Sequence, residues 1–289
     1  TVEADQMAVV AGNSSWMLIS ASLVLLMTPA LALFYGGMSS RRSVLNMMMM
    51  SFTALGIITV VYILWGWSMS YGTQSLAGVV ANPFEFFGLR NAVMDADGNY
   101  VAGANGYPAI IDVGFQLTFA VISTAIISGA VASRVKIGSW VVFAALWSTL
   151  VYFPLAHMVW GGGLLSHHEH SIAAWMFGTE NGEARIAPID FAGGTVVHIS
   201  AGTAALVLAL VIGRRQGFPT SNSRPHNLPL VMIGAALLWF GWFGFNAGSA
   251  FAADGMAGLA WVNTTAATAA AMLGWLAVER LRYGHATSL

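Results

Sequence analysis

Long uncharged, apolar stretches alternate with short polar segments along most of this chain. Each stretch is long enough for a helix across a hydrocarbon core of about 30 Å, because an α-helix rises about 1.5 Å per residue. The pattern therefore predicts an all-α, polytopic membrane protein with a single membrane domain over residues 1–289. Seven membrane-spanning helices are expected, at about residues 16–34, 44–71, 112–133, 139–159, 191–213, a stretch after Pro229 that ends near 249, and 256–278.

Polar segments separate these helices. Residues 1–15 are polar and acidic, and we expect an external, non-helical segment there. The ranges 72–110 and 164–189 are expected to be external loops, and 214–228 a cytoplasmic loop, because Gly, Pro and polar residues interrupt the apolar pattern at these places.

The basic residues test the orientation independently, since short cytoplasmic loops collect Lys and Arg. With the N-terminus outside, nine of the eleven Lys and Arg residues are cytoplasmic, and only Arg90 and Arg185 are external. The nine are Arg41, Arg42, Arg134, Lys136, Arg214, Arg215, Arg224, Arg280 and Arg282. We therefore expect a multi-pass protein of the cell inner membrane, with its N-terminus external and its C-terminus cytoplasmic.

Composition supports the membrane class and excludes others. The chain is 57% hydrophobic and 8% charged, with a mean hydropathy of +0.71. It contains no Cys, so thiol catalysis, disulfides and cysteine-ligated metals are excluded. Its net charge is −1 and no basic cluster exceeds two residues, which argues against a nucleic-acid partner. The first residue, Thr, fits a mature chain without its signal peptide and fits an engineered start equally well.

An acid and a histidine interrupt the fifth apolar stretch. Ionisable side chains at membrane depth are rare and costly, so their default interpretation is functional. This helix enters from outside at Asp190, and His198 is then expected ~12 Å deeper, near the middle of the membrane. The structural alternative is a histidine that hydrogen-bonds between packed helices.

Three other helices are expected to bring aromatic side chains and a hydroxyl to the same path. Phe115 and Phe119 form an i, i+4 pair on one helix face. Trp160 closes the fourth helix at the outer rim, and Ser249 ends the sixth, with Phe245 one turn, or ~6 Å, deeper. The predicted order, going inward, is Trp160 and Ser249, then Phe119 and Phe245, then His198.

This order of side chains suggests a chemistry. An aromatic face beside a hydroxyl suits a small monovalent cation, since cation–π attraction contributes ~0.5 to 2 kcal/mol. The deeper aromatic pair opposes any ion, because moving a bare charge into a low-dielectric medium costs on the order of tens of kcal/mol. Ammonium can leave its proton behind and pass as ammonia, which sodium and potassium cannot do. A desolvated, neutral His198 would offer one donor and one acceptor to ammonia or to a relayed proton.

Structural explanations stay open for several residues. Trp160 could belong to an interfacial aromatic belt, and Phe115 and Phe119 could simply pack. Asp190 fits a helix N-cap or a loop brace better than a proton acceptor.

Two loop segments carry weaker signals. The cluster of His167, His168 and His170 could bind a metal, although a solvated loop fits it better. The segment Asp95–Asn99 resembles part of a calcium loop but lacks the remaining ligand spacing, so we interpret it as a turn.

Six stretches resemble the ammonium transporter (Amt/Mep/Rh) family, and its Amt branch in particular. They are residues 32–37 (ALFYGG), 115–119 (FQLTF), 156–163 (AHMVWGGG), 190–198 (DFAGGTVVH), 225–229 (PHNLP) and 241–250 (GWFGFNAGSA). The resemblance implies that Trp160, Ser249 and Phe119 recruit ammonium, with Phe115 beside them. It implies further that Phe119 and Phe245 gate the path, Asp190 supports the site, and His198 and Trp242 line the pore.

The family pattern is longer than this chain. It comprises about eleven helices in two inverted repeats plus a last helix, with the site between the repeats. His198 would be the first of twin pore histidines, and the second belongs to a later helix, since His226 and His285 are both expected in cytoplasmic segments. We therefore expect a fragment of a longer protein. The family also implies a homotrimer, a cytoplasmic P-II regulatory protein, methylammonium as a substrate analogue, and no cofactor.

Three classes of function follow. The first is an ammonium transporter that deprotonates its substrate and conducts ammonia, with or without separate proton transfer. The second is an ammonium sensor that uses the same mouth with a signalling domain. The third, a membrane enzyme that uses His198 and Asp190, ranks last because no nucleophile motif or metal ligand set accompanies these residues, so we expect no enzyme activity.

Overall fold

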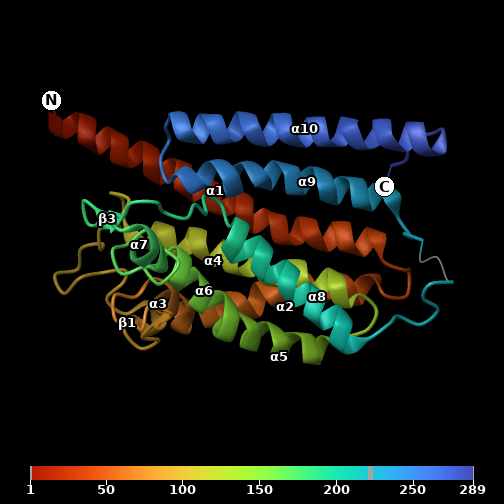
Figure 1. Ribbon diagram of the computed structural model, residues 1–289, viewed down its shortest axis with the longest axis horizontal. Coiled ribbons are helices and arrows are strands. Elements are labelled where there is room, and N and C mark those ends of the chain that lie inside the picture. Colours follow the sequence, from red (N-terminus) through yellow and green to blue (C-terminus); the bar gives the residue numbers. More distant parts are fainter. Residues whose placement is uncertain (1, 221–223, 289) are drawn as a thin grey trace.

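The computed structural model describes residues 2–220 and 224–288, and the chain is mostly helical over this part (Figure 1). The helices are α1 (Val2–Met38), α2 (Val44–Val61), α3 (Trp67–Tyr71), α4 (Ala109–Ile127), α5 (Ile137–Trp147), α6 (Phe153–Val159), α7 (Ile172–Phe177), α8 (Ser200–Ile212), α9 (Leu228–Ala247) and α10 (Gly255–Tyr283). Wider π-helical turns occupy Tyr62–Gly66, Ser148–Tyr152 and Gly194–Ile199, and 3-10 turns occupy Phe87–Leu89, Ser128–Val131 and Gly248–Ala250.

Within the described residues, six helical segments are long and apolar enough to cross a membrane. They are Val2–Met38, Val44–Tyr71, Ala109–Val131, Ile137–Val159, Gly194–Ile212 and Leu228–Ala250. They correspond to the first six predicted helices. The seventh predicted stretch is also helical, as α10, but it is not among these six. It is less apolar than the others because its middle carries Asn263 and three Thr residues.

The prediction that residues 1–15 are non-helical was wrong, because α1 begins at Val2. Glu3 and Asp5 lie in its first turn, where negative charge is favourable against the helix dipole. Polar residues at the surface do not prevent a helix, and α1 continues even through Pro29 to Met38. The predicted cytoplasmic loop 214–228 includes residues 221–223, which lie outside the described part.

The long helices lie side by side as an elongated bundle (Figure 1). α1 packs against α9, α4 and α2, and α4 also contacts α2 and α8. Of the six candidate spans, α4 is the most enclosed, whereas α10 packs mainly on α9 and buries only Ala257 and Thr264 among its described residues. The site described below is therefore built around α4.

Glycines set the close approach of α9 to α1. A Cβ atom placed on Gly234 would lie 2.4 Å from the backbone nitrogen of Phe34, and one on Gly244 would lie 2.6 Å from the backbone oxygen of Ser20. Small residues allow such backbone contact between helices in a membrane. This contact fixes the height of α9, and hence of Phe245, relative to α1.

Replacing Gly234 by alanine should destabilise the protein by about 1 to 3 kcal/mol, because the added methyl group meets backbone atoms that cannot rotate away. Gly274→Ala on α10 is the matched control, since no described atom lies within 4 Å of a Cβ built there. The midpoint of thermal unfolding in detergent measures the difference. Equal midpoints for the two variants would contradict the close packing of α1 on α9.

The two expected external loops contain short ordered elements. The first holds the hairpin of β1 (Ser75–Leu76) and β2 (Val80–Ala81), and the second holds α7 and the hairpin of β3 (Thr179–Glu180) and β4 (Glu183–Ala184). Both loops lie at the same end of the bundle (Figure 1). They meet there over the start of α4 and the end of α6, where a cavity opens.

Candidate functional site

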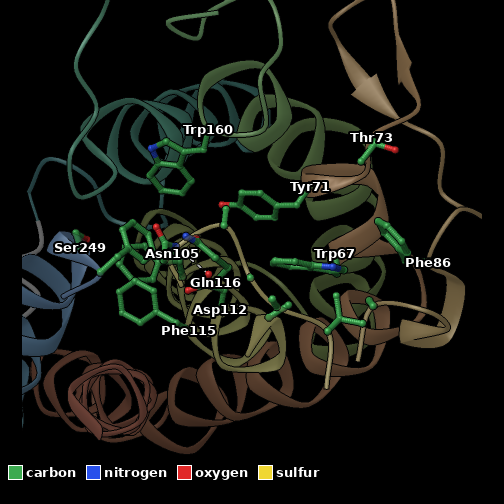
Figure 2. A pocket seen from close by; sticks show the side chains of 18 of the residues that line it. Trp67, Tyr71, Thr73, Phe86, Asn105, Asp112, Phe115, Gln116, Trp160 and Ser249 are labelled. Atoms are coloured by element: carbon green, nitrogen blue, oxygen red, sulfur yellow. Dashed lines mark hydrogen bonds between the residues drawn. The ribbon is translucent and has the colours of Figure 1, made fainter. Parts of the chain in front are cut away.

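A cavity of about 850 Å³ lies at this end of the bundle. Five of the residues expected at the site line it: Phe115, Phe119, Trp160, Asp190 and Ser249. They come from α4, the end of α6, the segment before Gly194–Ile199 and the end of α9, so residues far apart in the sequence share one space (Figure 2).

A ladder of aromatic rings leads from the cavity into the bundle. The ring of Phe119 lies 6.1 Å from that of Trp160, edge to face, and 4.3 Å from that of Phe245, stacked at 20°. The ring of Phe245 in turn stacks on that of His198 at 5.8 Å and 23°. These contacts link Trp160, Phe119, Phe245 and His198 in one chain, while their depth in a membrane stays a prediction. Phe119 and Phe245 are 1% and 3% exposed, so the stacked pair is buried next to the cavity that Phe119 lines.

Phe115 contributes to the cavity wall beside this ladder. Its ring packs against Phe119 at 4.7 Å and against Phe251 at 5.7 Å. Sequence reasoning missed Phe251, which lines the cavity with a left-handed backbone (φ 56°) directly after Gly248–Ala250. Its place two residues after Ser249 was the available signal.

Asp190 holds the start of the segment that carries His198. Its carboxylate accepts hydrogen bonds from the backbone N–H groups of Gly193 at 2.6 Å and of Thr195 and Val196 at 3.0 Å. Unpaired N–H groups at a helix start are satisfied in this way by N-cap carboxylates. The indole N–H of Trp160 donates to the backbone oxygen of Asp190 at 2.9 Å. The geometry therefore fits the N-cap interpretation, and it also ties Trp160 to the same segment.

Ser249 lies in the turn Gly248–Ala250 and is buried. Its hydroxyl donates to the backbone oxygen of Phe245 at 2.7 Å, one turn earlier. The donor is thereby used, while the hydroxyl oxygen keeps acceptor capacity toward the cavity.

The structure does not bring all expected residues into the cavity. His198 lies beyond the stacked pair and is exposed in the described chain, where no described group hydrogen-bonds its ring. Trp242 is partly exposed and lines a separate groove between α9 and α10 together with Asn246. His226 bonds the backbone oxygen of Ser39, away from His198.

The histidine loop borders the cavity without forming a metal cluster. His167 and His168 line the cavity, and their rings lie 4.7 Å apart. His167 approaches Glu183 at 3.8 Å, and His170 is exposed. In residues 2–220 and 224–288 there is no group of three His, Asp or Glu side chains placed to hold a metal ion, so the metal-binding alternative gains no support.

The segment Asp95–Asn99 forms a turn, as interpreted from the sequence. The carboxylate of Asp95 accepts from the backbone N–H groups of Asp97 at 3.0 Å and Asn99 at 2.8 Å. These bonds hold the pKa of Asp95 below its ordinary value, and the bond from the backbone of Asn99 has the largest effect.

Comparison with known proteins places the sequence among ammonium transporters. A model of the Ammonium Transporter Family matches residues 15–289. The ammonium transporter of Mycobacterium tuberculosis (strain H37Rv) is 52% identical over 289 residues, which cover 96% of this chain and 58% of that protein. The ammonium transporter of Aquifex aeolicus is 46% identical over 280 residues, covering 96% and 59%.

Solved structures give the same result for the fold. The crystal structure of Candida albicans Mep2 superposes with a TM-score of 0.79 at 27% identity, covering 96% of this chain and 57% of that chain. A structure described as a sensor Amt protein superposes with a TM-score of 0.80 at 26% identity, covering 96% and 64%. The chain thus spans less than two thirds of the length of the proteins that it matches.

Proposed function

Because the chain belongs to the ammonium transporter family, we propose that it forms the outer recruitment site and half of the pore of a protein that moves ammonium across a membrane. The observation that carries this proposal is the continuous ring contact from Trp160 through Phe119 and Phe245 to His198. The transporters that it resembles support ammonium as the substrate.

Recruitment takes place in the cavity. The face of Trp160 and the ring of Phe119 attract a monovalent cation, and the Ser249 oxygen accepts a hydrogen bond from it. Phe115 and Phe251 complete an apolar wall that partly strips water from the ion, which strengthens the attraction.

The stacked pair of Phe119 and Phe245 then selects the neutral form. No ion can exchange its hydration shell for two buried rings, because desolvation costs far more than cation–π attraction returns. Desolvation of neutral ammonia costs much less free energy, and ammonia passes when the rings rotate aside. Ammonium therefore transfers its proton to water on the cavity side of the pair, where the cavity is open to solvent.

His198 and Trp242 act beyond the gate. The Asp190 carboxylate fixes the turn that carries His198, and Phe245 fixes the plane of its ring. An imidazole without a described hydrogen-bond partner offers a donor and an acceptor to ammonia or to a proton. We expect later helices of the family to pack against the groove that Trp242 and α10 line.

We propose the same topology as for the family: an external N-terminus, α10 as a seventh membrane helix, and external loops at 72–110 and 164–189. The inner membrane, a homotrimer and a P-II regulatory partner at the cytoplasmic loops belong to this proposal. Many large apolar side chains of α8 and α10 are exposed in the described chain, including Leu206, Leu210, Leu273 and Trp275. Such surface needs lipid, further helices or neighbouring subunits to cover it.

Uptake of labelled methylammonium tests the function directly. The complete gene is expressed in a strain that lacks its own ammonium transporters, with an empty vector as control. We expect saturable uptake that unlabelled ammonium inhibits. Uptake equal to that of the vector, in cells whose membranes contain the protein, would contradict the proposal.

Ser249→Ala should raise the half-saturation concentration of methylammonium about twofold to tenfold, because one hydrogen bond contributes about 0.5 to 1.5 kcal/mol. The maximal rate should change little, since the ring ladder stays intact. Ser171→Ala, an N-cap serine outside the cavity, serves as the control. A large loss of maximal rate with unchanged half-saturation would remove Ser249 from recruitment.

A sensor is the second candidate function. It is favoured by the superposition on the sensor Amt protein, which is as close in fold as the Mep2 structures. The same cavity would bind ammonium and report it to a signalling domain. Methylammonium binding without uptake in the assay above, together with a signalling domain in the complete reading frame, would favour this function.

A further inference from the structure

One wall of the cavity is polar, and the recruitment residues do not include it. Asp112 and Gln116 lie one turn apart on the outer end of α4, and both line the cavity. Each is 8% exposed, so both side chains are buried inside the mouth. Figure 2 shows them beside Asn105, with Tyr71 pointing from α3 toward the same place.

The carboxylate of Asp112 keeps acceptor capacity. The hydroxyl of Tyr107 donates to one oxygen at 2.5 Å, and the amide of Asn105 donates to the other at 2.9 Å. Burial, together with the bond to Asp112 and its charge, raises the pKa of Tyr107 well above its ordinary value, so the phenol stays a donor. A carboxylate can accept about four hydrogen bonds, and two are made.

Asp190, the other carboxylate in the cavity, differs in this respect. It already accepts three backbone N–H groups. No Lys or Arg is among the described residues that line the cavity, so neither carboxylate has a fixed cationic partner there. The other titratable lining groups are Tyr71 on α3 and, in the second loop, His167 and His168. Asp112 is therefore the carboxylate with room for a mobile cation.

Gln116 and Tyr71 give independent evidence for a ligand. In the described part of the chain nothing hydrogen-bonds the side-chain amide of Gln116, although it is more than nine-tenths buried. The hydroxyl of Tyr71 is likewise buried without a partner among these residues. Buried polar groups are normally paired with protein, water or a ligand, so both groups next to Asp112 are available to a hydrogen-bond donor that enters the cavity.

We propose that Asp112, Gln116 and Tyr71 form a second cation subsite, which holds a monovalent, hydrogen-bond-donating cation before it reaches Trp160 and Ser249. Its identity as ammonium rests on the proposed function. The carboxylate supplies charge, and the Gln116 carbonyl and the Tyr71 oxygen accept two further N–H bonds. The subsite raises the local concentration of substrate in the mouth and does not take part in the gate.

Thallium(I), a monovalent cation with anomalous scattering, probes the subsite without transport. Crystals of the protein expressed from its complete gene are soaked in a thallium salt. We expect an anomalous peak beside the Asp112 carboxylate that disappears in Asp112→Asn. A peak that persists unchanged in this variant, or cavity peaks with none at Asp112, would overturn the subsite.

Uptake kinetics give a second test. Asp112→Asn should raise the half-saturation concentration of methylammonium about fivefold to tenfold, with a maximal rate within about twofold of the parent. Asp97→Asn, which removes the same charge from an exposed position in the loop before α4, should change neither. An unchanged half-saturation concentration for Asp112→Asn would overturn the inference.

Two further variants separate binding from loop support through Tyr107. Gln116→Glu in the Asp112→Asn background returns a charge to the cavity one turn away, and should restore the low half-saturation concentration. Gln116→Leu breaks no bond to any described residue, and should raise it about threefold. If Gln116→Glu did not rescue Asp112→Asn, and if Gln116→Leu had no effect, Asp112 would be a structural residue that supports the loop. A parent with the thallium peak but without uptake would refute the transport function while leaving the subsite in place.

Discussion

His198→Ala should abolish methylammonium uptake, or reduce it at least about a hundredfold, in the protein expressed from its complete gene. The imidazole is the polar group that follows the stacked pair of Phe119 and Phe245. Without this imidazole, ammonia or a released proton finds no polar side chain of this site beyond the gate, which raises the free-energy cost of passage. The protein should still reach the membrane, since no described group hydrogen-bonds the ring.

His285→Ala is the matched control, because His285 lies just after α10 and its ring bonds only the backbone oxygen of Tyr283 among described residues. Its uptake should equal that of the parent. Quantitative immunoblots of membranes check the amount of each variant. Parental uptake and parental transport current in His198→Ala would remove this residue from the conduction path.

Asp190→Ala should both destabilise the protein and eliminate uptake. The change leaves three backbone N–H groups at the start of Gly194–Ile199 without their acceptor, and each unpaired group costs about 1 to 3 kcal/mol. The turn then loosens, which displaces His198 and also the backbone oxygen of residue 190 that binds the indole of Trp160. Loss of thermal stability and loss of uptake should therefore appear together.

Asp190→Asn separates this bracing from proton chemistry. The amide keeps one acceptor oxygen and can satisfy part of the turn, so it should retain more stability than alanine. If Asp190 braces the site, uptake should follow stability across the two variants. A stable Asp190→Asn protein with no uptake would instead assign the carboxylate a direct role in proton transfer.

The membrane helices were predictable because composition and length decide them. A run of uncharged residues that matches the membrane thickness has few alternatives, and six predicted stretches are helical segments of the required kind. The start of α1 was missed because acidic residues were interpreted as loop, although Glu3 and Asp5 favour a helix N-terminus. For α10, the apolar stretch alone predicted a membrane helix. The polar residues in its middle make α10 a weaker candidate for a membrane span than the other six helices.

For the site, helix rise converts sequence distance into an expected depth, and this gave a predicted path from Trp160 to His198 whose function stays a prediction. The order from Trp160 to His198 reappears as ring contacts. The polar wall was missed because its geometry depends on loop residues. Tyr107 and Asn105, which precede α4 in the chain, hydrogen-bond to Asp112, and no periodic pattern in the sequence predicts these bonds. Rotation about the axis of α9 likewise decides that Trp242 faces α10 rather than the cavity.

Flux measurements with purified protein in lipid vesicles test the central claim most directly. The proposed filter requires that a charge cannot pass the buried pair of Phe119 and Phe245, whereas a molecule that sheds its proton can. Equal inward gradients of ammonium and potassium are applied to vesicles with and without protein, and both fluxes are recorded. We expect protein-dependent ammonium flux with a potassium flux at most about one hundredth as large. Potassium flux comparable to that of ammonium would contradict the account.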